Sequence, residues 1–174
     1  MKAKFIESPR LKLHALSLQY LSESYLGWLN DNDVFKYMES GGDYTYSQLK
    51  IFLKNVEESN IYFWAICLKD SNKHIGNIKI DPINSFLNSG EYGIMIGEKS
   101  EWGKGYAEEA SKAVIDFCFS SDVGLSSITL GVLKENVTAI RLYRKLGFSI
   151  DEKLQKEMSS DVLRFKLENK HHLK

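Results

Sequence analysis

The sequence has few cysteines and few prolines, and each shortage narrows what the protein can be. Its 174 residues include two cysteines, Cys67 and Cys118, and neither belongs to a CxxC or Cys/His cluster. We therefore expect no metal site and no disulfide framework, but two buried, reduced thiols. The two prolines are Pro9 and Pro82, and no Gly/Ser-rich linker divides the chain. A single domain over residues 1–174 is predicted.

The chain also lacks an excess of either charge and any long apolar run. Its 23 basic residues balance 23 acidic ones, which argues against nucleic-acid binding but leaves room for a local basic pocket. No window reaches the ~18 apolar residues of a membrane span, and residues 1–10 lack the apolar core of a signal peptide. The polar tail, residues 169–174, is expected to fray. We expect a soluble cytoplasmic protein with no membrane or nucleic-acid partner.

The hydrophobic pattern alternates between helical and strand periods. Helices are predicted at residues 16–30 (with Ser17 as N-cap), 33–38, 47–58, 107–119 and 137–146. Strands are predicted at residues 11–15, 62–68, 74–80, 91–96, 127–132, 148–154 and 162–167, with loops at 40–43 and 82–89. The fold class is α/β (α+β), with a parallel βαβ unit from Glu91 to Val132.

A glycine-rich segment, Glu101-Trp102-Gly103-Lys104-Gly105-Tyr106-Ala107, joins the fourth predicted strand to a helix. Two glycines let the backbone approach a ligand, and the helix N-terminus presents unpaired N–H groups that favour an anion such as a pyrophosphate. Lys104 adds positive charge. A tight turn without any ligand explains the segment equally well. It lacks both the third glycine of a dinucleotide fingerprint and the Gly-Lys-Ser/Thr ending of a P-loop.

A second segment makes the interpretation specific. It runs Asn136-Val137-Thr138-Ala139-Ile140-Arg141-Leu142-Tyr143-Arg144-Lys145-Leu146-Gly147-Phe148. Together the two segments resemble the cofactor motifs of the GNAT N-acetyltransferase superfamily, Gln/Arg-x-x-Gly-x-Gly/Ala and Asn-x-x-Ala-x-x-x-Tyr-x-x-x-Gly-Phe. The second motif matches fully, whereas Trp102 stands where Gln or Arg is commoner. That substitution and the opening Ser8-Pro9-Arg10-Leu11-Lys12-Leu13 resemble the branch of ribosomal-protein N-acetyltransferases. The resemblance covers roughly residues 8–167.

The resemblance implies a GNAT-like, mostly antiparallel sheet of about seven strands flanked by helices, and acetyl-CoA as co-substrate without a metal. It implies that the backbone of Met95 and Ile96 binds the pantetheine arm and polarises the thioester carbonyl. Asn136 would bind the pantetheine, although a pure N-cap role stays open. The pyrophosphate would be held by the turn residues Trp102, Gly103, Lys104, Gly105, Tyr106 and Ala107.

The resemblance also implies that Tyr143 is the general acid for the leaving thiolate, since Asn136 and Tyr143 are about two helical turns apart. Core packing is the alternative for this tyrosine. Some relatives carry a glutamate base where this chain has Gly131. Glu91 is the best substitute, and a strand-end carboxylate in water is its alternative. Asp81 and Glu39 are weaker candidates. A basic cluster on the same helix either meets the phosphates or forms a solvated face; it consists of Arg141, Arg144 and Lys145.

The acceptor is expected opposite the coenzyme A arm, built from residues 30–42, 81–89 and 154–162. Deprotonating a lysine-like amine at pH 7 costs about 4.6 kcal/mol, against about 1.1 kcal/mol for an α-amine. The lack of an obvious base therefore favours a low-pKa amine. An amino sugar, free or nucleotide-linked, is the first expectation, and a protein N-terminus the second. Polyamines are less favoured because no acidic cluster is evident. The residues that would contact the acceptor could equally be plain polar loops.

Two functional classes follow from these observations. In the first, the protein is an acyltransferase in which the amine attacks acetyl-CoA directly in a ternary complex, without an acyl-cysteine. In the second, it is a non-catalytic module that binds acyl-CoA. A homodimer is expected by family habit only.

Overall fold

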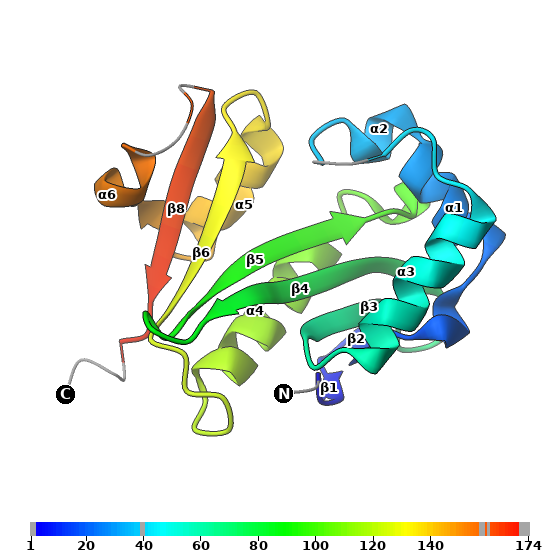
Figure 1. The fold of residues 1–174 in the computed structure, drawn as a ribbon, viewed down its shortest axis with the longest axis horizontal. Coiled ribbons are helices and arrows are strands. Elements are labelled where there is room, and N and C mark those ends of the chain that lie inside the picture. Colours follow the sequence, from blue (N-terminus) through cyan, green and yellow to red (C-terminus); the bar gives the residue numbers. More distant parts are fainter. Residues whose placement is uncertain (1–2, 39–40, 157–158, 160, 171–174) are drawn as a thin grey trace. The chain divides into compact units, whose positions relative to one another are not determined.

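The computed structural model describes residues 3–38, 41–156, 159 and 161–170 (Figure 1). The chain divides into two compact units. The first comprises Met1–Lys79 and Ile94–Ala113, and the second comprises Ile80–Gly93 and Val114–Lys174. The prediction of one domain over residues 1–174 stays a prediction.

In the first unit, β1 (Ile6–Glu7), β2 (Leu11–Ala15) and β3 (Tyr62–Leu68) precede the first part of β4 (His74–Asn84) and the last part of β5 (Ser89–Ile96). The strands are ordered β1-β2-β3-β4-β5. The β1/β2 and β2/β3 pairs are antiparallel. The helical elements are η1 (Leu18–Tyr20), α1 (Glu23–Asn30), α2 (Asn32–Phe35), α3 (Tyr46–Glu58), η2 (Lys99–Glu101) and the first part of α4 (Tyr106–Phe119).

The helix α3 shows how local sequence and packing agree in this unit. Thr45 and Gln48 form a capping box at its start, which satisfies two backbone donors reciprocally. Its buried face carries Leu49, Leu53 and Val56 at the spacing of an amphipathic helix. This face joins a cluster with side chains of α1 and β3 and with Leu16, which follows β2, and Figure 1 shows α1 and α3 next to each other there.

In the second unit, the remaining parts of β4, β5 and α4 are joined by β6 (Ser127–Leu133), α5 (Val137–Lys145), β7 (Ser149–Ile150), α6 (Glu152–Gln155) and β8 (Val162–Glu168). The strand order here is β4-β5-β6-β8-β7. Parallel pairing joins Ser89–Glu91 to Ser127–Thr129, which confirms the predicted parallel βαβ unit. Both β6 and β7 pair with β8 in antiparallel fashion.

The predicted fold class is confirmed: the sheet is mixed and mostly antiparallel, with helices beside it. Among the described residues it has eight strands rather than about seven, because the two-residue strand β1 is too short to give a periodic signal. Seven predicted segments match their elements to within one residue at either end, namely residues 11–15, 47–58, 62–68, 107–119, 127–132, 137–146 and 162–167. Over the described residues, no helix is long and apolar enough to cross a membrane.

Four element predictions are wrong in detail. The helix predicted at residues 33–38 is the shorter α2, which ends at Phe35. The predicted helix over residues 16–30 is a 3-10 turn followed by α1, because the Ser22 hydroxyl, not that of Ser17, accepts the cap bond from Tyr25 N. The loop predicted at 82–89 begins later, since β4 continues to Asn84. The strand predicted at 148–154 ends at Ile150, because Asp151 caps α6.

Candidate functional site

The glycine-rich turn lies in the first unit, between η2 and α4. Gly103 and Gly105 have φ angles of +75° and +82°, a region that favours glycine over residues with a side chain. A Cβ placed on Gly103 would have no neighbour within 4 Å, so steric contact does not explain this glycine, whereas its backbone conformation does. The helix α4 begins at Tyr106, and its first N–H groups have no partner within the helix. This open backbone can bind an anionic group such as a diphosphate.

Trp102 anchors the start of this turn to β5. Its indole Nε1 donates to the carbonyl oxygen of Ile96 at 2.7 Å, although 44% of the residue is exposed. The aromatic residue that replaces the commoner Gln or Arg therefore ties the end of the strand to the turn. Within the same unit, Gly76 lies so close to β5 that a Cβ there would meet the Met95 carbonyl oxygen. The backbone of Met95 and Ile96 is thus held on the β4 side and by Trp102.

The lysine of the turn has a carboxylate partner. Lys104 Nζ lies 2.8 Å from Glu101 Oε2, and Glu101 is largely buried. The hydrogen bond to Glu101 raises the pKa of Lys104, so the ammonium is charged at neutral pH. Its charge is directed toward Glu101 in this structure.

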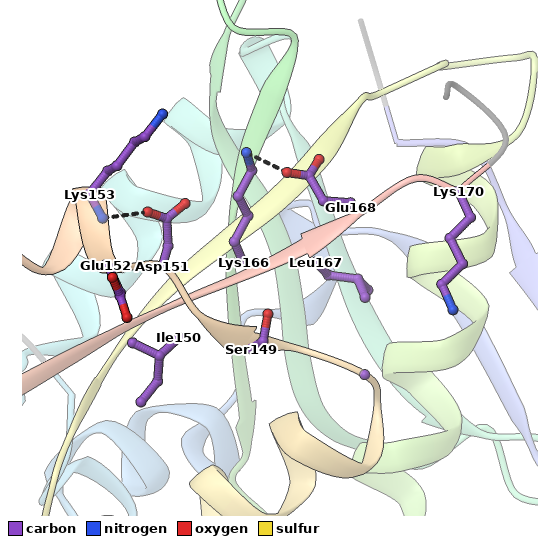
Figure 2. Close-up of a pocket in the computed structure, with 10 residues that line it drawn as sticks. Ser149, Ile150, Asp151, Glu152, Lys153, Lys166, Leu167, Glu168 and Lys170 are labelled. Atoms are coloured by element: carbon purple, nitrogen blue, oxygen red, sulfur yellow. Dashed lines mark hydrogen bonds and ion pairs between the residues drawn. The ribbon is translucent and has the colours of Figure 1, made fainter. Parts of the chain in front are cut away.

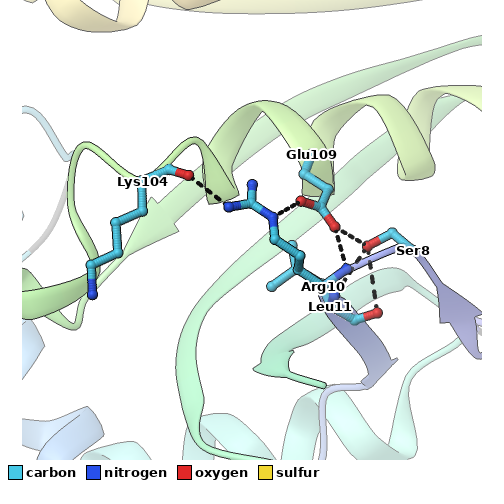
Figure 3. A network of polar contacts seen from close by, with 5 residues as sticks. All are labelled: Ser8, Arg10, Leu11, Lys104 and Glu109. Atoms are coloured by element: carbon cyan, nitrogen blue, oxygen red, sulfur yellow. Dashed lines mark hydrogen bonds and ion pairs between the residues drawn. The ribbon is translucent and has the colours of Figure 1, made fainter. Parts of the chain in front are cut away.

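Arg10, far from the turn in sequence, contacts it directly (Figure 3). Arg10 Nη1 donates to the Lys104 carbonyl oxygen at 2.9 Å, and Arg10 Nε donates to Glu109 Oε2 at 2.7 Å. The guanidinium carbon lies 4.5 Å from the centre of the Tyr106 ring. The Ser8-Pro9-Arg10-Leu11 segment resembles a branch of the family, but its sequence does not indicate this contact. No periodic or motif signal links residues 94 positions apart.

Glu109, in the first turn of α4, secures Arg10 from the other side. Its Oε1 accepts from the Arg10 backbone N–H at 2.7 Å and from the Ser8 hydroxyl at 2.8 Å. Burial raises the pKa of Glu109, but the hydrogen bonds from Arg10 and Ser8 outweigh it, so the pKa lies below its usual value. The carboxylate is therefore ionised at neutral pH and holds Arg10 against the start of α4.

The second unit contains the other predicted site residues. Tyr143 of α5 is 8% exposed, and its ring meets Tyr92 edge-on at 5.6 Å and Phe148 at 6.1 Å. Burial raises the pKa of Tyr143 to about 12, so the phenol is protonated at neutral pH. Asn136 caps α5, because its Oδ1 accepts from Ala139 N at 3.2 Å. Gly147 ends this helix with a φ of +94°, as predicted.

Glu91 is engaged by two neighbouring strands of the same unit. Both its oxygens receive bonds from Arg164, Nη1 at 2.6 Å and Nη2 at 2.8 Å, and Oε2 also accepts from the Thr129 hydroxyl at 2.6 Å. Gly131 makes this possible, since a Cβ there would lie 3.0 Å from Arg164 Nη1. The position where some relatives carry a glutamate is therefore used here to accommodate a guanidinium. Sequence reasoning missed Arg164.

The other predictions have mixed outcomes. Both thiols are buried and free, as expected. Asp81 lies in β4, and Glu39 lies outside the described residues. Arg144 and Lys145 lie in the last turn of α5. Positive charges there interact favourably with the negative end of the helix dipole.

A polar hollow beside β7 and β8 is a separate feature of the second unit (Figure 2). Its lining includes Asp151, Lys166 and Glu168, and the last two form an ion pair at 2.6 Å. None of the predicted catalytic or cofactor-binding residues lines it.

Comparison with known proteins agrees with this geometry. The family of the acetyltransferase (GNAT) domain matches residues 10–149. The uncharacterized N-acetyltransferase p20 of Bacillus licheniformis is 29% identical over 143 residues, which span 80% of this chain and 79% of p20. Spermidine N(1)-acetyltransferase of Escherichia coli is 38% identical over 82 residues, 47% of this chain and 43% of that enzyme.

A solved structure supports the fold. The crystal structure of spermidine N-acetyltransferase from Vibrio cholerae, in complex with CoA and spermine, has a TM-score of 0.77 at 21% identity, covering 96% of this chain and all of that one. At this identity the likeness concerns the fold alone. The family match over residues 10–149 leads to one conclusion: this chain belongs to the GNAT acetyltransferase family and is an acyltransferase.

Proposed function

We propose that this protein transfers the acetyl group of acetyl-CoA directly to the primary amine of a small molecule. The observation that carries the proposal is the turn Gly103–Gly105, where two glycines with positive φ precede the N-terminus of α4. Such a turn offers backbone N–H groups to a diphosphate without side-chain obstruction. The residues proposed to bind acetyl-CoA are Met95, Ile96, Trp102, Gly103, Lys104, Gly105, Tyr106, Ala107 and Asn136.

The proposed chemistry is one acyl transfer. The amine nitrogen forms a bond to the thioester carbonyl carbon, the C–S bond breaks, one amine proton leaves, and the sulfur acquires a proton. We assign the proton donor to Tyr143. A pKa of about 12 lies about 3.5 units above that of a thiol, so full transfer would be uphill by about 4.8 kcal/mol. The main role of Tyr143 is therefore to donate a hydrogen bond to the developing thiolate.

Glu91 is the proposed acceptor of the amine proton, and its partners limit how it can act. Arg164 donates to both carboxylate oxygens, so protonation of Glu91 would weaken two hydrogen bonds to a charged acceptor, each worth about 1.5–3 kcal/mol. An amine of low pKa costs only about 1.1 kcal/mol to deprotonate at pH 7 and can lose its proton to water. This comparison supports an acceptor whose amine has a low pKa.

An amino sugar, free or nucleotide-linked, is the first proposed acceptor class, and a protein N-terminal amine is its alternative. A polyamine is a third candidate, which the 38% identity to spermidine N(1)-acetyltransferase over 82 residues supports. Its amines have high pKa values, so this reaction would depend more strongly on a base.

The test is a panel of amines with acetyl-CoA, read as release of the CoA thiol. The panel contains free and nucleotide-linked amino sugars, N-terminal peptides and spermidine. We expect turnover with an amino sugar. Turnover with spermidine alone would replace amino sugars with polyamines as the acceptor class. If CoA binds without any turnover, the protein is a binding module, and if CoA does not bind, the proposal fails.

A glycine substitution tests the turn itself. Gly103→Ala introduces a Cβ at a φ of +75°, which should raise the KM for acetyl-CoA roughly tenfold because the turn must relax to a different backbone conformation. The control is Gly124→Ala, at a φ of +68° in the second unit. It should cost similar stability but leave that KM unchanged.

A further inference from the structure

Arg10 carries hydrogen-bond donors that the protein itself does not use. An arginine has five N–H donors in a rigid fork. Nε is bonded to Glu109 and Nη1 to the Lys104 carbonyl, whereas Nη2 has no hydrogen-bond partner among the residues that the structure describes. Nη2 lies 3.5 Å from the point where a Cβ on Gly105 would stand. An unused donor of a fixed guanidinium therefore lies beside the glycine-rich turn.

The guanidinium is held in place on several sides. Nε donates to Glu109 and Nη1 to the Lys104 carbonyl, as Figure 3 shows. The guanidinium carbon also lies over the Tyr106 ring. The Arg10 backbone N–H is also bonded to Glu109. A side chain that is already ordered loses little rotamer freedom when it binds a ligand, so each new hydrogen bond is less costly.

The other cation of the turn is arranged differently. The Lys104 ammonium is paired with Glu101, and Figure 3 shows its side chain extending away from Arg10. The two acidic residues in the first turn of α4 are also paired, Glu108 with Lys112 and Glu109 with Arg10. Their negative charge is thus compensated beside the turn, while 47% of the Arg10 side chain remains exposed to solvent.

We infer that Arg10 is a phosphate-binding residue, which donates from Nη2 to an oxygen of the CoA diphosphate while Nη1 and Nε hold the turn and Glu109. The inference rests on the proposed function. It adds a side chain from the start of the chain to a site otherwise made of main-chain donors. A guanidinium presents paired N–H groups that suit phosphate oxygens better than a single ammonium does.

The experiment compares Arg10→Met, Arg10→Lys and the wild type. The Kd for CoA is measured by calorimetry at two salt concentrations, kcat at saturating acetyl-CoA with the best acceptor, and the melting temperature. We expect Arg10→Met to raise the Kd for CoA roughly tenfold or more and to weaken its salt dependence, with kcat within about twofold of the wild type. Arg10→Lys should give a smaller loss, because lysine keeps the charge but cannot make all these bonds.

The control is Lys12→Met, which removes the same charge two residues further along the chain, in β2, where the Lys12 ammonium donates a hydrogen bond to Asn72 Oδ1. It should leave the Kd for CoA unchanged. The inference is overturned if Arg10→Met binds CoA within about twofold of the wild type, if the control loses as much affinity, or if kcat falls while the Kd holds. Should Arg10→Met fail to fold, the Kd for CoA and the kcat of Arg10→Lys are compared with the wild type and the control in the same way. A wild type that does not bind CoA would instead reject the proposed function.

Discussion

Tyr143 illustrates how a single side chain can be both core and candidate catalyst. Its ring packs against Tyr92 and Phe148, so the packing alternative describes part of its role. Its hydroxyl has no hydrogen-bond partner among the described residues, and a buried phenol usually finds one. A phenol protonated up to a pH of about 12 is a donor that is always available at neutral pH. The residue therefore suits hydrogen bonding to a thiolate better than complete proton release.

Replacing this hydroxyl tests the assignment. Tyr143→Phe should lower kcat by about a hundredfold or more, the usual contribution of a general acid, while the Kd for CoA stays within about twofold because the ring is retained. The measurement is steady-state thiol release together with calorimetry. Tyr46→Phe, at an exposed tyrosine of α3, is the matched control. Unchanged turnover in Tyr143→Phe would remove this residue from the mechanism.

At the scale of elements, α1 and β4 meet around a histidine. The His74 ring contacts Tyr20, Tyr25 and Trp28, with ring centres 4.8–5.4 Å away. His74 Nε2 lies 2.9 Å from the Gly76 carbonyl and 3.0 Å from Asn77 Oδ1. Since both partners are acceptors, Nε2 carries the proton. Burial lowers the pKa of His74, and these two hydrogen bonds only partly oppose the shift.

This environment predicts a pH dependence of stability. A histidine whose folded pKa is lowered stabilises the protein at pH values above its unfolded pKa of about 6.5, and that contribution is lost as the pH falls toward the folded pKa. The wild-type free energy of unfolding should therefore decrease as the pH falls from about 7 to about 5. Most carboxylates titrate only below this range. Denaturant unfolding of the wild type and His74→Gln measures it. The variant should be less stable at pH 7 and show a flatter profile, and equal slopes would contradict the prediction.

At the scale of the whole molecule, the two cysteines bear on the reaction path. Burial raises the pKa of the Cys118 thiol to about 12, which leaves a thiolate fraction on the order of 10⁻⁵ at pH 7. Burial also raises the pKa of Cys67, partly opposed by a hydrogen bond with Tyr20. Neither thiol is suited to form an acyl-enzyme, which favours direct transfer in a ternary complex.

Mass spectrometry checks this expectation. Protein incubated with acetyl-CoA in the absence of amine should show no acetylated Cys67 or Cys118, because a buried neutral thiol is a poor nucleophile. Unfolded protein treated in the same way is the control, since its thiols are accessible and should react. An acetylated cysteine that disappears when amine is added would establish an acyl-enzyme and reject direct transfer.

The sequence by itself determined the parallel βαβ unit, the glycine conformations of the turn and the capped helix α5. Each depends on neighbours within a few residues, where hydrophobic period, positive φ and capping chemistry leave readable signals. Short elements such as β1 and β7 have no period to read. Only the tertiary structure decided that Arg10 hydrogen-bonds Lys104 and Glu109. It also decided that Arg164 hydrogen-bonds the carboxylate of Glu91, 73 positions away. Such contacts follow from strand order and register, which bring distant residues together without any local pattern.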